Sequence, residues 1–500
     1  MRHDIRVYVS LVLLALPMGT QAQGPGLGNL TYTANELWRP ISVLHSPQGH
    51  GNVAMVNGYL MVIYSSDGGG TASDGGIEFW DVSDPRHPGL VARHDNTNTR
   101  GLREAHGFAF SNSYPGTYMV AQAHEGIQFW DVSDPLRIAL IRYMDLPGIN
   151  SGNYSGAWWV FWQAPYVYVA GTGSGLYVIN ATDPANPVLV THVPTSQLGG
   201  LIPGQVFALG NLLLLMEVAG GTYATMDISD PTNPMLIQIF QGKMGYSHLF
   251  AAGKIFTAGG NGDVPRLYVH NVTPQGSIAF VGEVGSGLDN GGYGSYQDGF
   301  FHAGFSNKYA KFNVATLTQL GTGTSGLTDR DEDFGQVLGN LVFVGDDHGT
   351  GTALIVHQSA PDTRGPEVHW AHPQPGATTV ALTTRVGVSM SDNIDMASVD
   401  STTFSVRPLG GQALPGKYSV QMGLVNFTPA VSQQPNTTYE VVVKGMQDYV
   451  GNPGGTFSSR FSTRATTPSP PSGEGIAQLR ASQRTRLSGR YIFRRKTYVY

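Results

Sequence analysis

Three histidines and one aspartate have side-chain types and positions that could hold a metal ion: His50, His106, His248 and Asp333. Each histidine stands just before an apolar segment that begins a repeated unit, and Asp333 precedes another such segment. Imidazole nitrogens combined with a carboxylate suit a divalent transition metal such as zinc or copper. We therefore regard these four residues as a candidate metal site. The alternative is that the histidines cap inner strands or bind water.

The acidic segment 329–333 (Asp-Arg-Asp-Glu-Asp) offers a second kind of metal chemistry. Its alternating carboxylates match part of an EF-hand calcium loop, whose pattern also requires glycine at the sixth position and glutamate at the twelfth. Here the glycine is seventh, as Gly335, and the twelfth residue is Asn340. We therefore expect an exposed acidic loop.

Composition and motifs exclude several classes of chemistry. The chain has no cysteine, which excludes disulfides, thiolate metal ligands and a cysteine nucleophile. It also lacks the Gly-x-Ser-x-Gly, P-loop, dinucleotide-binding and His-Glu-x-x-His motifs. The net charge is −6, and the residues after 475 carry seven basic side chains and no acid, so the rest is near −13 (−6 minus 7). An acidic body of this kind disfavours nucleic acid as a partner.

The elements that must position the candidate residues come from a repeated segment. Residues 79–85 (Phe-Trp-Asp-Val-Ser-Asp-Pro) recur unchanged at 129–135, and looser copies follow. The repeated polar position is found at residues 81, 131, 180, 227, 271, 313 and 357. Strand-forming runs around each of these positions, separated by turn residues, give each unit about four short strands. A period of roughly 40 to 50 residues built from such strands predicts an all-β fold, a seven-bladed β-propeller.

The repeat resembles the LVIVD repeat family, on the segment Gly-Ile-Glu-Phe-Trp-Asp-Val-Ser-Asp-Pro at residues 76–85 and its copies. The resemblance covers roughly residues 45–360 and implies a propeller without a fixed enzymatic activity. The aspartates of the repeat, such as Asp81 and Asp84, stand in a Ser-Asp-Pro turn, where their carboxylates bond nearby backbone N–H groups. We interpret them as turn caps and not as catalytic acids.

The two ends of the propeller segment are expected to meet. The seventh unit lacks its last strand, and residues 41–44 (Ile-Ser-Val-Leu) form a strand-like run without a repeat of its own. A closed ring removes free sheet edges. We predict that residues 41–44 complete the seventh unit, within a propeller domain at residues 36–362.

The N-terminal residues 1–22 have the features of a secretory signal peptide. Arg2 and Arg6 precede a short apolar stretch, and Thr20-Gln21-Ala22 offers small residues for cleavage before Gln23. No later stretch reaches the length of about 18 apolar residues that a membrane helix needs. The chain is therefore expected to be exported, to the periplasm, the cell surface or the medium, with no transmembrane segment.

A second domain follows at residues 366–464, after a linker at 362–366. It is similar to the SbsA-type bacterial Ig-like domain in segments such as Val-Asn-Phe-Thr-Pro (425–429), Asp-Tyr-Val-Gly-Asn-Pro (448–453) and Phe-Ser-Thr (461–463). The resemblance implies a β-sandwich that acts as a spacer on exported, cell-surface proteins. Alternation of apolar and polar residues at 439–443 supports a sandwich independently. Residues 465–500 are expected to be a linker and a basic tail.

Aromatic residues gather at Trp158, Trp159, Phe161 and Trp162. We interpret them as core filling between blades, with a stacking surface for carbohydrate or peptide as the alternative. The whole chain is expected to be a non-enzymatic binding or adhesion-type protein, with a protein or carbohydrate ligand on the propeller face. Two alternatives stay open: a metal-dependent oxidoreductase or hydrolase, and a structural surface-layer component.

Overall fold

The computed structural model describes residues 23–65, 75–96, 101–102, 106–149, 156–259, 266–285, 291–305, 308–327, 334–349 and 351–465. The candidate signal peptide, Asp333 and the basic tail lie outside these ranges. Strands form nearly all of the regular secondary structure, beside three 3-10 turns: η1 (Thr172–Ser174), η2 (Thr195–Gln197) and η3 (Met396–Ser398). Among the described residues, no helix is long and apolar enough to cross a membrane.

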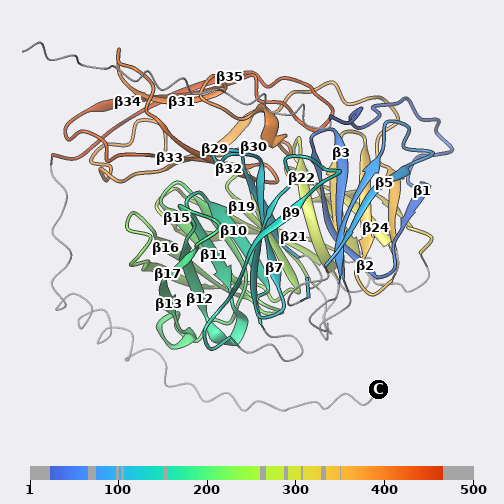
Figure 1. Ribbon diagram of the computed structural model, residues 1–500, viewed down its shortest axis with the longest axis horizontal. Coiled ribbons are helices and arrows are strands. Elements are labelled where there is room, and N and C mark those ends of the chain that lie inside the picture. The colour runs from blue at the N-terminus through green and yellow to red at the C-terminus, as the bar shows by residue number, and fades with distance from the viewer. Residues whose placement is uncertain are drawn as a thin grey trace, which may run out of the picture.

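Antiparallel units of four strands make up the larger part of the molecule (Figure 1). Units one to three are β2 (Gly49–Val56), β3 (Tyr59–Ser65), β4 (Gly76–Asp81) and β5 (Gly89–Asp95); β6 (Phe108–Ser111), β7 (Tyr118–Ala123), β8 (Gly126–Asp131) and β9 (Ala139–Asp145); β10 (Trp159–Gln163), β11 (Tyr166–Ala170), β12 (Leu176–Asn180) and β13 (Val188–Val193). Units four and five are β14 (Pro203–Leu209), β15 (Leu212–Glu217), β16 (Thr222–Asp227) and β17 (Met235–Gln241); β18 (Ser247–Ala251), β19 (Lys254–Ala258), β20 (Arg266–Val272) and β21 (Ile278–Gly285). Units six and seven are β22 (Gly291–Gln297), β23 (Phe300–Phe305), β24 (Lys308–Asn313) and β25 (Thr318–Gly323); β26 (Phe334–Leu338), β27 (Leu341–Asp346), β28 (Gly351–Val356) and β1 (Pro40–His45).

The first strand of each unit lies against the first strands of neighbouring units, as in the succession β6, β10, β14, β18, β22, β26 and β2. These strands are almost wholly buried, whereas the fourth strands, such as β5 and β13, are largely exposed. First strands inside and fourth strands outside are the arrangement of blades around a central channel. The expected all-β propeller is therefore confirmed.

Strand β1 closes the ring. It pairs antiparallel with β28, with Ser42 opposite Leu354 and Leu44 opposite Thr352. The backbone N–H of Trp38 also donates to the carbonyl of Val356 over 2.7 Å. The prediction that residues 41–44 complete the seventh unit is confirmed, because the pairing removes the free edge of β28.

The Ser-Asp-Pro turns act as predicted and also connect neighbouring blades. The N–H of Ser83 donates to Asp81 Oδ1 over 2.9 Å, and the N–H of Ser133 donates to Asp131 Oδ1 over 3.0 Å. The outer strand of the preceding blade then contacts the turn, since His94 Nε2 lies 3.1 Å from the Pro135 carbonyl. These aspartates are thus occupied in turns, as the turn-cap interpretation requires.

The C-terminal domain is a sandwich of two sheets. One sheet has the order β29 (Val368–His372), β30 (Val386–Met390), β33 (Leu424–Pro429) and β32 (Gly416–Gln421); the other has the order β31 (Phe404–Pro408), β34 (Thr438–Lys444) and β35 (Thr456–Ser462). Buried side chains from both sheets, such as Phe404, Phe427 and Phe461, fill the space between them. The Ig-like sandwich expected from the sequence is confirmed.

This Ig-like domain lies flat across one face of the propeller (Figure 1). A β-bridge between Val420 and Phe110 joins β32 to β6. Hydrogen bonds also connect it to residues at the ends of the inner strands: Ser419 Oγ to Ala164 N (3.3 Å), Asn426 Nδ2 to Ala208 O (2.9 Å), Ser389 Oγ to Ala252 N (2.8 Å) and Ser391 O to Asp298 N (2.7 Å). The domain therefore packs against the channel mouth and does not stand apart from it.

The segment expected to be a linker is part of this interface. Asp362 is buried, its N–H donates to Asn29 Oδ1 over 2.8 Å, and its carbonyl accepts from Asn29 Nδ2 over 2.6 Å. The sequence of residues 362–366 indicates a turn because of its proline and glycine. It does not reveal that the N-terminal segment supplies a partner more than 300 positions away.

A pair of substitutions in the second repeat tests the blade packing. Trp130 is buried, and its Nε1 donates to Gln128 Oε1 over 3.0 Å. We expect Trp130→Ala to lower the free energy of unfolding by roughly 3–5 kcal/mol, because it leaves a cavity between blades. Pro135→Ala is expected to cost about 1 kcal/mol or less, because proline acts mainly on the unfolded chain. Denaturant unfolding measures both; equal losses would contradict this assignment of Trp130 to the core.

Candidate functional site

His106 lies in the channel among aromatic rings. Its ring centroid is 4.6 Å from that of Trp158, 4.9 Å from Tyr293 and 5.8 Å from Phe334. Trp158 Nε1 donates to the Tyr293 hydroxyl over 2.8 Å, which joins β22 to the segment that leads into β10. This end of the channel is therefore filled by packed aromatic side chains.

His50 and His248 lie between blades. His50 Nδ1 is 2.8 Å from Thr352 Oγ1 on β28, and burial lowers its pKa to about 3. His248 has protein partners on both ring nitrogens, with Nδ1 2.9 Å from Thr257 Oγ1 and Nε2 3.0 Å from the Glu217 carbonyl. Burial also lowers the pKa of His248 to about 3. Both imidazoles are thus neutral groups of the inter-blade core.

The structure does not bring these three histidines together. Within the ranges that the structure describes, they belong to no group of three potential ligands whose donor atoms lie within 4.8 Å of one another. Their partners come from different places: unit seven for His50, the channel rings for His106, and units four and five for His248. The proposed fourth ligand, Asp333, and the acidic segment around it lie outside the described residues. The four-residue metal site stays a prediction.

The aromatic cluster is core, as interpreted from the sequence. Trp158, Trp159, Phe161 and Trp162 are all at most 1% exposed. Trp159 contacts Phe207 of the next blade with ring centroids 5.5 Å apart, and Trp162 contacts Phe129 of the previous one at 5.6 Å. Rings buried between blades leave no face for stacking a carbohydrate at this place.

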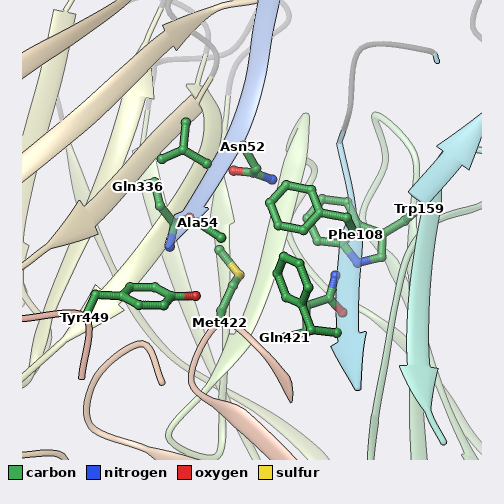
Figure 2. A pocket seen from close by; sticks show the side chains of 10 residues that line it. Asn52, Ala54, Phe108, Trp159, Gln336, Gln421, Met422 and Tyr449 are labelled. Atoms are coloured by element: carbon green, nitrogen blue, oxygen red, sulfur yellow. The ribbon is translucent and has the colours of Figure 1, made fainter. Parts of the chain in front are cut away.

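A small cavity lies in the channel directly under the Ig-like domain (Figure 2). The hairpin formed by β32 and β33 closes it, with Gln421 and Met422 facing Trp159 and Phe108 of the inner strands. Gln421 Nε2 donates to the Val160 carbonyl over 3.1 Å, which fixes the hairpin in the channel mouth. Ligands therefore have no open path into the channel from this side.

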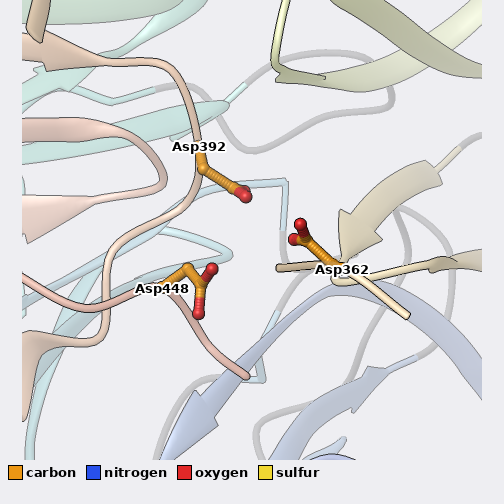
Figure 3. Close-up of side chains that lie close together, drawn as sticks. All are labelled: Asp362, Asp392 and Asp448. Carbon is orange, nitrogen blue, oxygen red and sulfur yellow. The ribbon is translucent and has the colours of Figure 1, made fainter. Parts of the chain in front are cut away.

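Three buried aspartates gather where the propeller, the joining segment and the Ig-like domain meet (Figure 3). Asp362, Asp392 and Asp448 each place a carboxylate oxygen within 4.8 Å of the other two. Gln297 Nε2 lies 2.9 Å from Asp392 Oδ2 and 3.3 Å from Asp362 Oδ2. Carboxylates in this arrangement either share protons or hold a hard cation. The sequence did not indicate this cluster, because Asp362 and Asp448 stand in turn-like segments. The three carboxylates come together only where the domains dock.

Burial decides the charge of this cluster. It raises the pKa of Asp448 to about 6 and the pKa of Asp392 well above its ordinary range; the pKa of Asp362 is also raised. Hydrogen bonds from Val450 N and Asn452 N to Asp448 Oδ1, each 2.9 Å, oppose part of this effect. Near neutral pH the cluster therefore retains protons that ordinary carboxyl groups have lost.

Replacing Asp448 by asparagine should change how stability depends on pH. The raised pKa means that the folded protein keeps a proton that the unfolded chain releases at lower pH. The stabilisation is complete below about pH 4 and is lost as the pH rises through 6. The difference in unfolding free energy, Asp448→Asn minus wild type, is therefore expected to increase by about 1 kcal/mol between pH 5.5 and 7.5, a range in which the protein stays folded. A difference that is constant across this range in chelator-treated protein would contradict the raised pKa.

Comparisons with known proteins agree with the two-part architecture. The bacterial Ig-like domain family matches residues 362–463, and the LVIVD repeat family matches residues 162–195 and 218–241. A search of the curated proteins found no match. Among solved structures, the β-propeller domain of Cps50 (Swd1) from Myceliophteria thermophila is 9% identical, with a TM-score of 0.47 over 63% of this chain and 99% of that one. The periplasmic gluconolactonase PpgL of Pseudomonas aeruginosa is 13% identical, with a TM-score of 0.46 over 64% and 91%.

Proposed function

Since the chain carries LVIVD repeats and a C-terminal bacterial Ig-like domain, we propose that it is an exported, non-enzymatic protein that binds a macromolecular ligand of the cell envelope. The binding surface is the propeller face opposite the Ig-like domain. Bacterial Ig-like domains are typical of extracellular proteins, and residues 1–22 have the pattern of a secretory signal peptide.

The observation that carries the proposal is the closure of the channel. The β32–β33 hairpin covers one mouth, and aromatic side chains fill the channel beyond the cavity. A buried catalytic centre needs polar groups and a path for the substrate. The hairpin blocks such a path on the Ig-like side, so the outer face of the propeller is left for recognition.

The described part of this face presents apolar side chains near the starts of the inner strands. Ile202, just before β14, is 41% exposed, and Met244, shortly before β18, is 49% exposed. The inner strands end at the Ig-like domain, so their starts face the other way. Exposed apolar residues at a channel rim are suited to contact with a partner.

Export is tested by expressing the full chain in a bacterial host and sequencing the N-terminus of the released protein. We expect a mature chain that begins at Gln23. A chain that keeps residues 1–22 and stays in the cytoplasm would refute export.

Binding is tested with labelled mature protein and isolated bacterial envelopes, untreated, protease-treated or periodate-oxidised. We expect saturable binding that one treatment abolishes, which identifies the ligand as protein or carbohydrate. The double variant Ile202→Asp, Met244→Asp should bind at least about tenfold more weakly. Leu409→Asp, at an exposed site on the Ig-like domain, is the matched control. Equal binding by all three proteins would refute the proposed face.

The alternative function, a metal-dependent enzyme, is tested in parallel. Elemental analysis of the purified protein should find no stoichiometric zinc or copper. One metal per chain that is lost in His106→Ala would instead favour the predicted metal site.

A further inference from the structure

Blade six breaks the residue pattern that all other blades follow at one core position. The position in question lies on the third strand of each blade, two residues before the repeated polar position. Its side chain is buried and stands opposite a residue of the second strand. In the other six blades these cross-strand pairs contain at least one large apolar residue and no charge: Phe79 with Met61, Phe129 with Val120, Val178 with Tyr168, Thr225 with Leu214, Val269 with Phe256, and Ile355 with Val342. In blade six the pair is Lys311 with His302.

Both members of this polar pair are buried. Lys311 is 7% exposed and His302 is 0% exposed. Lys311 Nζ lies 4.4 Å from the centre of the Phe300 ring and 3.0 Å from His357 Nδ1. No carboxylate of a described residue lies within ion-pair distance of Lys311. A buried ammonium without a counter-charge is costly, so the position calls for an explanation.

The hydrogen bonds show which groups are left over. His357 Nδ1 accepts from Lys311, so its Nε2–H donates to the Gly339 carbonyl over 3.1 Å. His302 Nδ1 is 2.8 Å from the Tyr309 hydroxyl, and His302 Nε2 has no partner although it is fully buried. When the Tyr309 hydroxyl donates to Nδ1, Nε2 carries a hydrogen. Lys311 has two further N–H bonds. In this tautomer of His302 the cluster is rich in donors and short of acceptors.

We propose that Lys311 and His302 form a binding site for one small monovalent anion of halide size, held between blades six and seven. The anion would accept from Lys311 Nζ and His302 Nε2 and would neutralise the only charge of the pair. It would connect blade six to His357 at the end of β28, beside the strand that closes the ring.

The site should work in a defined pH range. Burial lowers the pKa of Lys311 to about 8, while the charge of Asp298 opposes this shift. The other titratable groups that face the amine are His302 and His357, which burial keeps neutral, and Tyr309, whose pKa burial raises. The amine is thus charged below about pH 8, and anion binding should weaken as the pH rises above that value.

Thermal unfolding at constant ionic strength tests the proposal, with sodium chloride or bromide replacing sodium gluconate at pH 6.5. We expect a saturable stabilisation that reaches about a tenfold change in the folding equilibrium at tenfold excess over Kd. The double variant Lys311→Ile, His302→Val reproduces the apolar pair of blade seven, so it should fold and should lose the saturable response. Lys308→Ala removes a positive charge from the same strand and is the matched control.

A crystal grown in bromide gives an independent readout. The anomalous signal of bromide is expected between Lys311 Nζ and His302 Nε2. A water molecule there, together with equal stability in halide and gluconate, would overturn the proposal. So would a saturable halide response of unchanged size in the double variant.

Discussion

A protein that lacks residues 23–46 is expected to lose roughly 5 kcal/mol or more of its free energy of unfolding, which is comparable to the whole stability of many domains. The deletion removes β1 and exposes the edge of β28. It also removes Leu27, Tyr32 and Leu44, which are buried at 8%, 3% and 0% exposure. Burying each such side chain contributes roughly 1.5–3 kcal/mol. The segment also supplies Asn29, the partner of Asp362 at the domain joint.

Two point variants separate ring closure from loss of chain. Leu44→Ala should lower the unfolding free energy by about 2–5 kcal/mol, because the side chain is fully buried. His45→Ala, on the next residue of β1 but exposed, should change it by less than about 0.5 kcal/mol. Urea denaturation of the three variants makes the comparison. A deletion variant as stable as wild type would show that β1 is dispensable for the ring.

The sequence was sufficient for the fold because the first four blades repeat the same local signals. A Ser-Asp-Pro or Thr-Asp-Pro turn marks the end of the third strand in each of them, and the spacing of these turns gives the size of a blade. The closing strand could also be predicted, since one unit lacked a strand and residues 41–44 had no unit. Both inferences depend on local pattern and on the rule that free edges are avoided.

The arrangement of the two domains could not be predicted in the same way. Asp362, Asp392 and Asp448 come from the joining segment and two Ig-like loops, and only docking places them together. His50 and His248 were expected just before inner strands, and the structure has them at the second residues of β2 and β18. The direction of a side chain at the start of a strand depends on the local register. A bulge between His50 and Val53 changes that register. The break in the repeat at Lys311, by contrast, was visible in the sequence as a lysine where other units have apolar or small residues.

Acidification should unfold the protein, with a midpoint near pH 5. Burial lowers the pKa of His50, His248 and His357 to about 3 and that of His270 to about 4, and it lowers the pKa of His302 well below the ordinary value. The unfolded chain takes up protons on these residues below about pH 6.5, whereas the folded protein does not. The stability that neutral burial contributes is complete above about pH 6.5 and is lost as the pH falls. At pH 5 each of the four groups with a folded pKa of about 3 or 4 would favour unfolding by about 2 kcal/mol, and together they approach the stability of a domain.

Carboxyl groups whose pKa values burial raises act in the opposite direction; they are Asp298, Asp362, Asp392, Asp395 and Asp448. Urea denaturation from pH 7.5 to 5 measures the net effect. We expect His248→Gln to lower the steepness of the acid transition by about one bound proton, because it removes one group that titrates only after unfolding. His45→Gln, at an exposed position of β1, should leave the steepness unchanged. Stability that is constant between pH 7.5 and 5, together with an unchanged steepness in His248→Gln, would contradict the control of acid unfolding by these buried imidazoles.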